Sequence, residues 1–262
     1  MNKKHFTALL LAGLLLLAGC GQGGGQTGDL LSRIKERGEL VVAMEGTWAP
    51  WTYHDGNDEL VGYDVEVARA VAEKLGVAVR FEEGDFDGLL AGLEAGRYDV
   101  MVNGVNVDEE RSQKYDFTEP YAYDHIAVIV RRGDDSIRSL EDLAGKRTAN
   151  TITSTYAKLA ERYGAEVTGV DDLNQTFELL FSGRIDATLN AEVSYYDYMK
   201  AHPDADIEIA VLAPDADKVA IPVPKGETAL VNAINGALAE LREDGTLREL
   251  ALKYFDTDIS DP

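Results

Sequence analysis

Apolar residues recur along this chain at two spacings, and each spacing predicts a kind of element. Short apolar runs are typical of buried strands, whereas apolar residues three or four positions apart indicate helices. The segment 64–75 has the helical spacing, and we expect Asp64 to cap this helix and Gly76 to end it. Thr246 and Glu249 have the spacing of a capping box for the last helix. The expected strands span 40–44, 77–81, 98–102, 146–150 and 166–170. The remaining expected helices span 87–95, 154–163, 171–182 and 228–241.

Strand and helix segments alternate through most of the chain, which favours mostly parallel sheets with helices on both faces. The scheme contains an internal echo, because 93–99 and 180–186 share the pattern Leu-x-x-Gly-Arg-x-Asp. In each copy a glycine, Gly96 or Gly183, can end a helix in the left-handed conformation immediately before a strand. The echo suggests two similar α/β lobes. Chance convergence on a common helix-to-strand turn is the alternative.

Two stretches can join such lobes as extended strands, namely 125–130 and 219–223. If the chain crosses near residue 125 and returns near 220, the first lobe is discontinuous. We therefore expect 30–125 plus 221–262 to form lobe 1 and 126–220 to form lobe 2. A two-strand hinge of this kind would allow the lobes to open and close.

The N-terminal segment has the pattern of a secretory signal peptide, which we expect to span 1–19. Its uncharged stretch, 6–19, follows two lysines and is too short to span a bilayer comfortably. The stretch ends in Leu-Ala-Gly-Cys20, which resembles the lipobox of bacterial lipoproteins. The resemblance implies cleavage before Cys20, a lipid on that cysteine and a glycine-rich tether over 20–29. An ordinary signal peptide with a chance cysteine is the alternative.

Composition excludes several classes of protein. The net charge of −22 repels nucleic-acid phosphates, so we expect no nucleic-acid partner. The single cysteine leaves no disulfide framework, and the histidines are not spaced as metal ligands. We therefore expect neither a metal site nor a cofactor.

Arg111 is the first candidate for ligand binding. Asp108 is a good N-cap, and Glu109 and Glu110 suit the positive end of the helix dipole, whereas a cation in the same first turn does not. A guanidinium beside free main-chain N–H groups can bind a carboxylate through two parallel bonds. An Arg111 neutralised on the surface by Glu109 or Glu110 is the alternative.

Aromatic and hydroxyl side chains follow other expected strands. Loops at the carboxyl ends of parallel strands are where open α/β sheets bind ligands. Trp48, Trp51 and Phe86 lie in such loops and could stack on an apolar or sulfur-containing ligand, or they could belong to the core. Ser154 and Thr155 begin a helix, where they could bind an anion or act only as a cap.

Several motifs, taken together, resemble the periplasmic and lipoprotein amino-acid-binding proteins that serve ABC importers. The resemblance covers about 30–259. It implies an α/β, type II periplasmic-binding-protein fold with two lobes, each a mixed, mostly parallel sheet flanked by helices, joined by a two-strand hinge. The motifs are Thr47-Trp-Ala-Pro-Trp51, Leu60 to Ala68, Asp85-Phe-Asp-Gly-Leu89, Gly96-Arg-Tyr-Asp99, Glu110-Arg111 before Tyr115 to Tyr121, and Leu241 to Thr246.

The same resemblance implies a ligand site between the lobes. Arg111 would hold the α-carboxylate of an amino acid, helped by Thr155 and by main-chain groups near Asn106. The other implied lining residues are Asn103 and Gly104 on the same edge, and Trp48 and Phe86 on either side of the ligand's side chain.

The sequence departs from the family at the position that commonly receives the α-ammonium group. An Asp is usual after the Gly-Arg-x-Asp strand, and Ala191 stands here. We expect Glu192 or Glu45 to supply the negative charge instead. The stretches 188–193 and 195–198 look most like the cystine-binding branch, so L-cystine is the expected ligand.

The resemblance also implies the partners and the location. We expect a monomer outside the cytoplasmic membrane, lipid-anchored to it, that delivers an amino acid to an ABC transporter permease. A dehydratase-like enzyme on the same fold is one alternative, although no Ser-His-Asp or Cys-His set is visible. A ligand-sensing partner of a receptor is the other.

Overall fold

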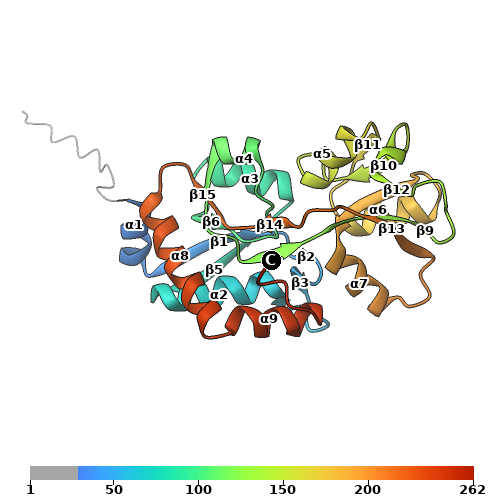
Figure 1. The fold of residues 1–262 in the computed structure, drawn as a ribbon. Helices are drawn as coiled ribbons and strands as arrows, with labels where there is room; N and C mark the ends of the chain where they lie inside the picture. Colours follow the sequence, from blue (N-terminus) through green and yellow to red (C-terminus); the bar gives the residue numbers. More distant parts are fainter. Residues whose placement is uncertain (1–28) are drawn as a thin grey trace, which may run out of the picture.

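The computed structural model describes residues 29–262, which form two lobes side by side (Figure 1). The predicted signal peptide and the predicted lipidation at Cys20 lie outside the described residues. None of the described helices is both long enough and apolar enough to cross a membrane.

The first lobe contains a three-stranded parallel sheet in the order β5-β1-β6, formed by Ala78–Glu83, Glu39–Met44 and Val100–Met101. The central strand β1 is apolar on both faces, because helices cover both. Leu40, Val42 and Met44 pack into one cluster, and Ala43 packs into another on the opposite face. The first cluster includes side chains of α1 (Leu30–Arg37), α2 (Tyr63–Leu75), α8 (Thr228–Glu243) and α9 (Thr246–Phe255), and the second includes α3 (Phe86–Glu94).

The second lobe contains a five-stranded mixed sheet in the order β11-β10-β12-β9-β13. The first two pairings are parallel and the last two antiparallel. Alternate side chains of β9 again feed two clusters, one under α5 and one under α6 and α7. The strands are Glu166–Gly169, Arg147–Asn150, Ala187–Ala191, Ile126–Arg131 and Ile207–Leu212, and the helices are α5 (Thr155–Arg162), α6 (Leu173–Phe181), α7 (Glu192–Ala201) and the short 3-10 helix η1 (Leu140–Leu143).

Two antiparallel strands run between the lobes, β8 (Ala122–Asp124) and β14 (Asp217–Val219). Strand β8 leads into β9 after a break at His125, so the strand expected over 125–130 is β9, which begins one residue later and is preceded by β8. The remaining elements belong to the first lobe. They are β2 (Thr47–Trp48), β3 (Thr52–His54), β4 (Leu60–Val61), α4 (Glu109–Lys114), β7 (Tyr115–Phe117) and β15 (Pro222–Pro224).

The internal echo has the same structural role in both lobes. In the first, Asp99 exchanges two hydrogen bonds with the main chain of Val41: its carboxylate accepts from N–H at 2.7 Å, and its own N–H donates to the carbonyl at 3.0 Å. In the second, Asp186 does the same with Arg147, at 2.9 and 2.7 Å. Gly96 and Gly183 both have positive φ, as expected. Each copy therefore fixes a strand beside the central parallel strand of its own sheet.

Two expected helix caps are wrong. Helix α2 begins at Tyr63 after Gly62, so Asp64 lies inside its first turn and is fully buried. Its carboxylate accepts hydrogen bonds from Tyr121 Oη (2.7 Å) and Gly104 N (2.6 Å), which tertiary packing brings to it. Helix α9 lacks the capping box, because the Thr246 hydroxyl donates to Asp244 at 2.6 Å instead.

Candidate functional site

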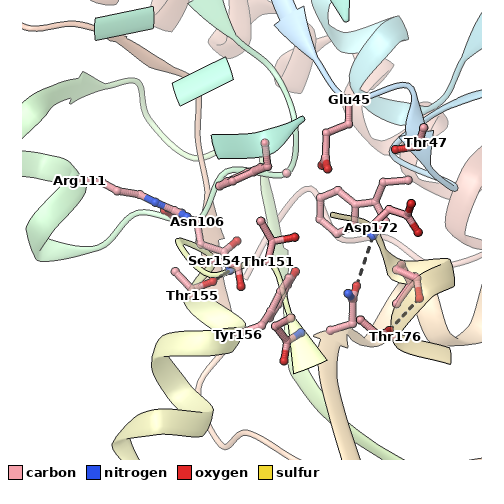
Figure 2. A pocket seen from close by; sticks show the side chains of 16 residues that line it. Glu45, Thr47, Asn106, Arg111, Thr151, Ser154, Thr155, Tyr156, Asp172 and Thr176 are labelled. Carbon is pink, nitrogen blue, oxygen red and sulfur yellow. Dashed lines mark hydrogen bonds between the residues drawn. The ribbon is translucent and has the colours of Figure 1, made fainter. Parts of the chain in front are cut away.

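A pocket with about 580 Å³ of open space lies between the two lobes (Figure 2). Its walls come from loops that follow β1 and β6 in the first lobe, from the loop after β10, and from the first turns of α3, α5 and α6. These are the carboxyl ends of parallel strands and the N-termini of helices, where main-chain N–H groups are free for a ligand. The structure brings most of the expected site residues to this pocket, namely Glu45, Trp48, Phe86, Gly104, Asn106, Arg111 and Thr155.

Arg111 lies in α4, where the carboxylate of the N-cap Asp108 accepts a hydrogen bond from its main-chain N–H at 2.7 Å. Its side chain is only 6% exposed. The guanidinium donates to the carbonyl of Asn106 at 2.8 Å and, across the cleft, to the carbonyl of Thr153 at 3.0 Å. The Phe86 ring lies 5.3 Å from the guanidinium carbon. These neighbours hold the cation in one orientation at an end of the pocket.

The negative charges near Arg111 are mostly engaged elsewhere. Glu110 pairs with Lys114 and Lys158, so it does not neutralise Arg111 on the surface. Asp108 pairs with Lys158 at 2.9 Å, and its distance to Arg111 Nε is long at 3.7 Å. Among the described residues Nε has no hydrogen-bond partner, and burial lowers the pKa of the guanidinium. A carboxylate from a ligand would complete this site.

Trp48 forms an aromatic wall of the pocket. Its indole stacks on Trp51 with ring centres 5.5 Å apart, and its Nε1 donates across the cleft to Asn190 Oδ1 at 3.3 Å. Gly104 lies directly against the ring, because a Cβ at that position would be 2.6 Å from a ring carbon. Trp51 itself is 1% exposed and packs on Phe255, so it belongs to the core and not to the ligand surface.

Asn106 connects the two lobes at the inner end of the pocket. Its side-chain amide donates to Thr155 Oγ1 in the second lobe at 2.9 Å and to Asp217 in the hinge at 2.6 Å. The contacts of Trp48 and Arg111 also cross the cleft, as described above. The structure therefore has its lobes in direct contact around the pocket, as in a closed clamp.

Glu45 lies across the pocket from Arg111, next to Asp172 (Figure 2). Its carboxylate accepts a hydrogen bond from Asn103 Nδ2 at 2.7 Å, and its main-chain N–H donates to Asn103 Oδ1 at 2.7 Å. Burial, together with the charges of Asp172 and other acidic groups, raises the pKa of Glu45 to about 7, although the Asn103 bond opposes the shift. The pocket is thus positive at one end and acidic at the other.

Two expected site residues are not in the pocket wall. Asn103 is fully buried behind it and acts through Glu45. Glu192 borders a separate outer cavity next to Asp124 and Tyr196, because the chain turns into α7 at Ala191 and carries the side chain away from the cleft. Of the two carboxylates expected to replace the missing Asp, only Glu45 lines the pocket.

Sequence reasoning missed several lining residues. Tyr156 is the largest of them, and its position in the first turn of α5, next to Thr155, was the available signal. Others depend on strand order that the sequence alone does not reveal. The missed residues are Thr47, Asn150, Thr151, Tyr156, Asp172, Leu173, Thr176 and Asn190.

Two lobes on open α/β sheets, joined by paired crossing strands and closing on a polar pocket, define the class of two-lobed binding proteins with the type II periplasmic-binding-protein fold. Within this class, residues 40–257 match the bacterial extracellular solute-binding proteins, family 3. The chain belongs to this family.

Three relatives illustrate the similarity. A probable amino-acid ABC transporter-binding protein of Haemophilus influenzae is 40% identical over 99% of this chain and 100% of its own. The L-cystine solute receptor of Neisseria gonorrhoeae, solved unliganded and open, is 42% identical over 90% of this chain and 100% of that chain, with a TM-score of 0.62. An ancestral arginine-binding protein bound to arginine is 38% identical over 84% of this chain and 99% of that chain, with a TM-score of 0.78.

The structure superposes better on the arginine-bound relative than on the open one, although the open one is more similar in sequence. This ordering agrees with the hydrogen bonds across the cleft, which hold the lobes together here. The family acts outside the cytoplasm and its members are named as binding proteins of transporters, so the chain is an extracytoplasmic binding protein and not an enzyme.

Proposed function

We propose that this protein is the amino-acid receptor of an ABC importer and that Arg111 binds the α-carboxylate of the ligand between the lobes. The observation that carries the proposal is the geometry of Arg111: a buried guanidinium at one end of the pocket, anchored by carbonyls from both lobes, whose Nε has no hydrogen-bond partner within residues 29–262. Thr155, in the first turn of α5, supports the same role, because its hydroxyl and the nearby main chain can donate to a carboxylate. Binding there would stabilise the closed arrangement, since the ligand would contact both lobes.

We propose L-cystine as the ligand. Each half of cystine carries a carboxylate and an ammonium group, so one half can approach Arg111 while the ammonium of the other approaches Glu45 and Asp172. The disulfide in the middle would lie near Trp48 and Phe86, where sulfur packs favourably on aromatic rings. The 42% identity with an L-cystine receptor supports this assignment. Arginine is the second candidate, because the acidic end of the pocket also suits a guanidinium.

The remaining organisation is proposed from the sequence. Cleavage before Cys20 would leave a lipidated cysteine and a glycine-rich tether that hold a monomeric receptor at the membrane surface. The clamp would consist of 30–125 with 221–262 as lobe 1 and 126–220 as lobe 2. The pairing of β8 with β14 supports hinge crossings near these boundaries.

Calorimetric titration tests the receptor and its ligand directly. The purified protein, unfolded and refolded to remove any bound ligand, is titrated with L-cystine, L-arginine and the other amino acids. We expect tight one-to-one binding of L-cystine with no chemical change in it. Binding of arginine alone would replace cystine as the ligand, and no heat with any amino acid would contradict the proposed function.

Arg111→Ala tests the carboxylate assignment. We expect it to abolish measurable binding without unfolding the protein. Arg138→Ala is the control, because that arginine is 72% exposed and does not line the pocket. Unchanged affinity in the Arg111 variant would place the carboxylate elsewhere.

A further inference from the structure

A second, narrower space adjoins the ligand pocket on its hinge side. The two spaces share Gly104, Asn106 and Tyr156 in their walls, so the ligand pocket and the hinge meet at these residues. The narrower space is also lined by Ala191, the position at which the sequence departs from the family that it resembles.

Two carboxylates, Asp124 and Asp217, face this space from the hinge. They are direct cross-strand partners in the antiparallel pairing of β8 with β14. Asp217 accepts a hydrogen bond from the side-chain amide of Asn106 at 2.6 Å, so it lies immediately behind the pocket wall. Asp124 is 7% exposed, and its Oδ2 has no hydrogen-bond partner among residues 29–262.

Buried like charges on opposing strands are unfavourable unless a cation compensates for them. The charged groups around Asp124, Glu192 and Asp217, are acidic, and only main-chain N–H groups of His125 and Val193 favour its ionised form. His125, beside Asp124 in the hinge, donates from Nδ1 to the carbonyl of Ala213 at 2.9 Å. Burial raises the pKa of both carboxyls, and for Asp124 the neighbouring Glu192 adds to the effect.

The position of this pair relative to Arg111 suits one particular cation. Burial raises the pKa of Asp217, and Arg111 is the nearby charge that opposes this most, with a smaller contribution from Arg162. In an amino acid the α-ammonium and the α-carboxylate are borne by the same carbon, so an ammonium group must lie close to whatever binds the carboxylate. Asn106 contacts both ends of this arrangement, because its carbonyl accepts from Arg111 and its amide donates to Asp217.

We infer that Asp124 and Asp217 form an anionic subsite in the hinge that binds the α-ammonium group of the ligand, in place of the carboxylate missing at Ala191. The inference rests on the proposed function, since it requires an amino acid with its carboxylate on Arg111. It gives the ligand a direct influence on the two hinge strands. Glu45 is then left for a cation at the far end of the pocket.

The test compares two probes that differ only in their amino groups, L-cystine and 3,3′-dithiodipropionate. In Asp124→Asn and Asp217→Asn we expect affinity for L-cystine to fall by about ten- to a hundredfold, the range of a charge-assisted hydrogen bond. Affinity for dithiodipropionate should stay as in the unmodified protein, because it has no ammonium group. Asp197→Asn is the matched control, a half-buried aspartate of α7 that does not line the ligand pocket.

A rescue variant separates a binding role from a folding role. In the Asp124→Asn protein, Ala191→Asp returns a carboxylate to the same space, and we expect it to restore most of the lost affinity for L-cystine. Asparagine preserves the shape of aspartate, and circular dichroism checks that each variant is folded.

Three results would overturn the inference while leaving the proposed function intact. They are unchanged L-cystine affinity in both Asp variants, equal losses for both probes, or a loss in Glu192→Gln in their place. If the unmodified protein binds no amino acid, the proposed function is contradicted, and so is the subsite, because it requires an amino-acid ligand.

Discussion

Glu45 is expected to destabilise the unliganded protein at neutral and alkaline pH, and Glu45→Gln should relieve that cost. The carboxylate faces the pocket beside Asp172, and burial is the main reason that its pKa rises from 4.5 to about 7. Gln keeps an oxygen that can accept the hydrogen bond from Asn103, so the substitution removes the charge and little else.

The direction in which stability changes with pH follows from proton binding to Glu45. Below about pH 4.5 the side chain is protonated and uncharged in both the folded and the unfolded chain, so it does not lower the stability of the fold. As the pH rises towards 7, the unfolded chain loses this proton first, and the folded state becomes relatively less stable. Above the folded pKa the cost is constant at about 3 kcal/mol, the value that corresponds to this change of pKa. Partial contact with solvent reduces it, so we expect about 1–3 kcal/mol.

Urea unfolding of the purified protein without ligand, at about pH 5 and about pH 8.5, measures this difference. Glu45→Gln should be more stable than the unmodified protein at the higher pH and nearly equal to it at the lower. Glu94→Gln, at an exposed position at the end of α3, should show no such divergence. A stability difference for Glu45→Gln that is the same at both pH values would refute the reasoning, because it would not arise from ionisation.

Three further substitutions test other parts of the structure. Arg111→Lys should weaken ligand binding by about ten- to a hundredfold in calorimetry, because an ammonium cannot make the two parallel bonds of a guanidinium; equal affinity would show that only charge matters. Gly104→Ala should shift tryptophan fluorescence and weaken binding, because its Cβ meets the Trp48 ring, whereas Gly38→Ala, with positive φ but no atom of the described residues within 4 Å of the new Cβ, should only lower stability. Asp186→Ala should lower the free energy of unfolding by about 1–3 kcal/mol in a urea titration, because the main-chain N–H of Arg147 in the neighbouring strand loses its acceptor. An unchanged free energy of unfolding would show that the repeated motif does not stabilise the second lobe.

Local patterns along the chain were sufficient for the main elements and for part of the pocket. The apolar run of β1 and the helical spacing of α2 predict these elements because burial of a strand or a helix face needs that spacing. Arg111, Trp48 and Phe86 could be selected because they lie in loops after strands or at helix starts, where ligands of α/β proteins bind.

Tertiary structure alone decided which distant groups meet. Asp64 has the sequence context of a cap, yet packing against Tyr121 and the pocket loop makes it a buried acceptor that holds Gly104. Glu192 is next to Ala191 in sequence, but the turn into α7 takes its side chain outside the cleft.

The hinge is the clearest example of a contact that only the tertiary structure decides. Asp124 and Asp217 are 93 residues apart along the chain, and only the antiparallel pairing of β8 with β14 makes them partners. Periodicity reports which face of an element is buried, because that depends on neighbours a few residues away. Which charges share a cavity depends on strand order and on the way the lobes close, and no local spacing encodes either.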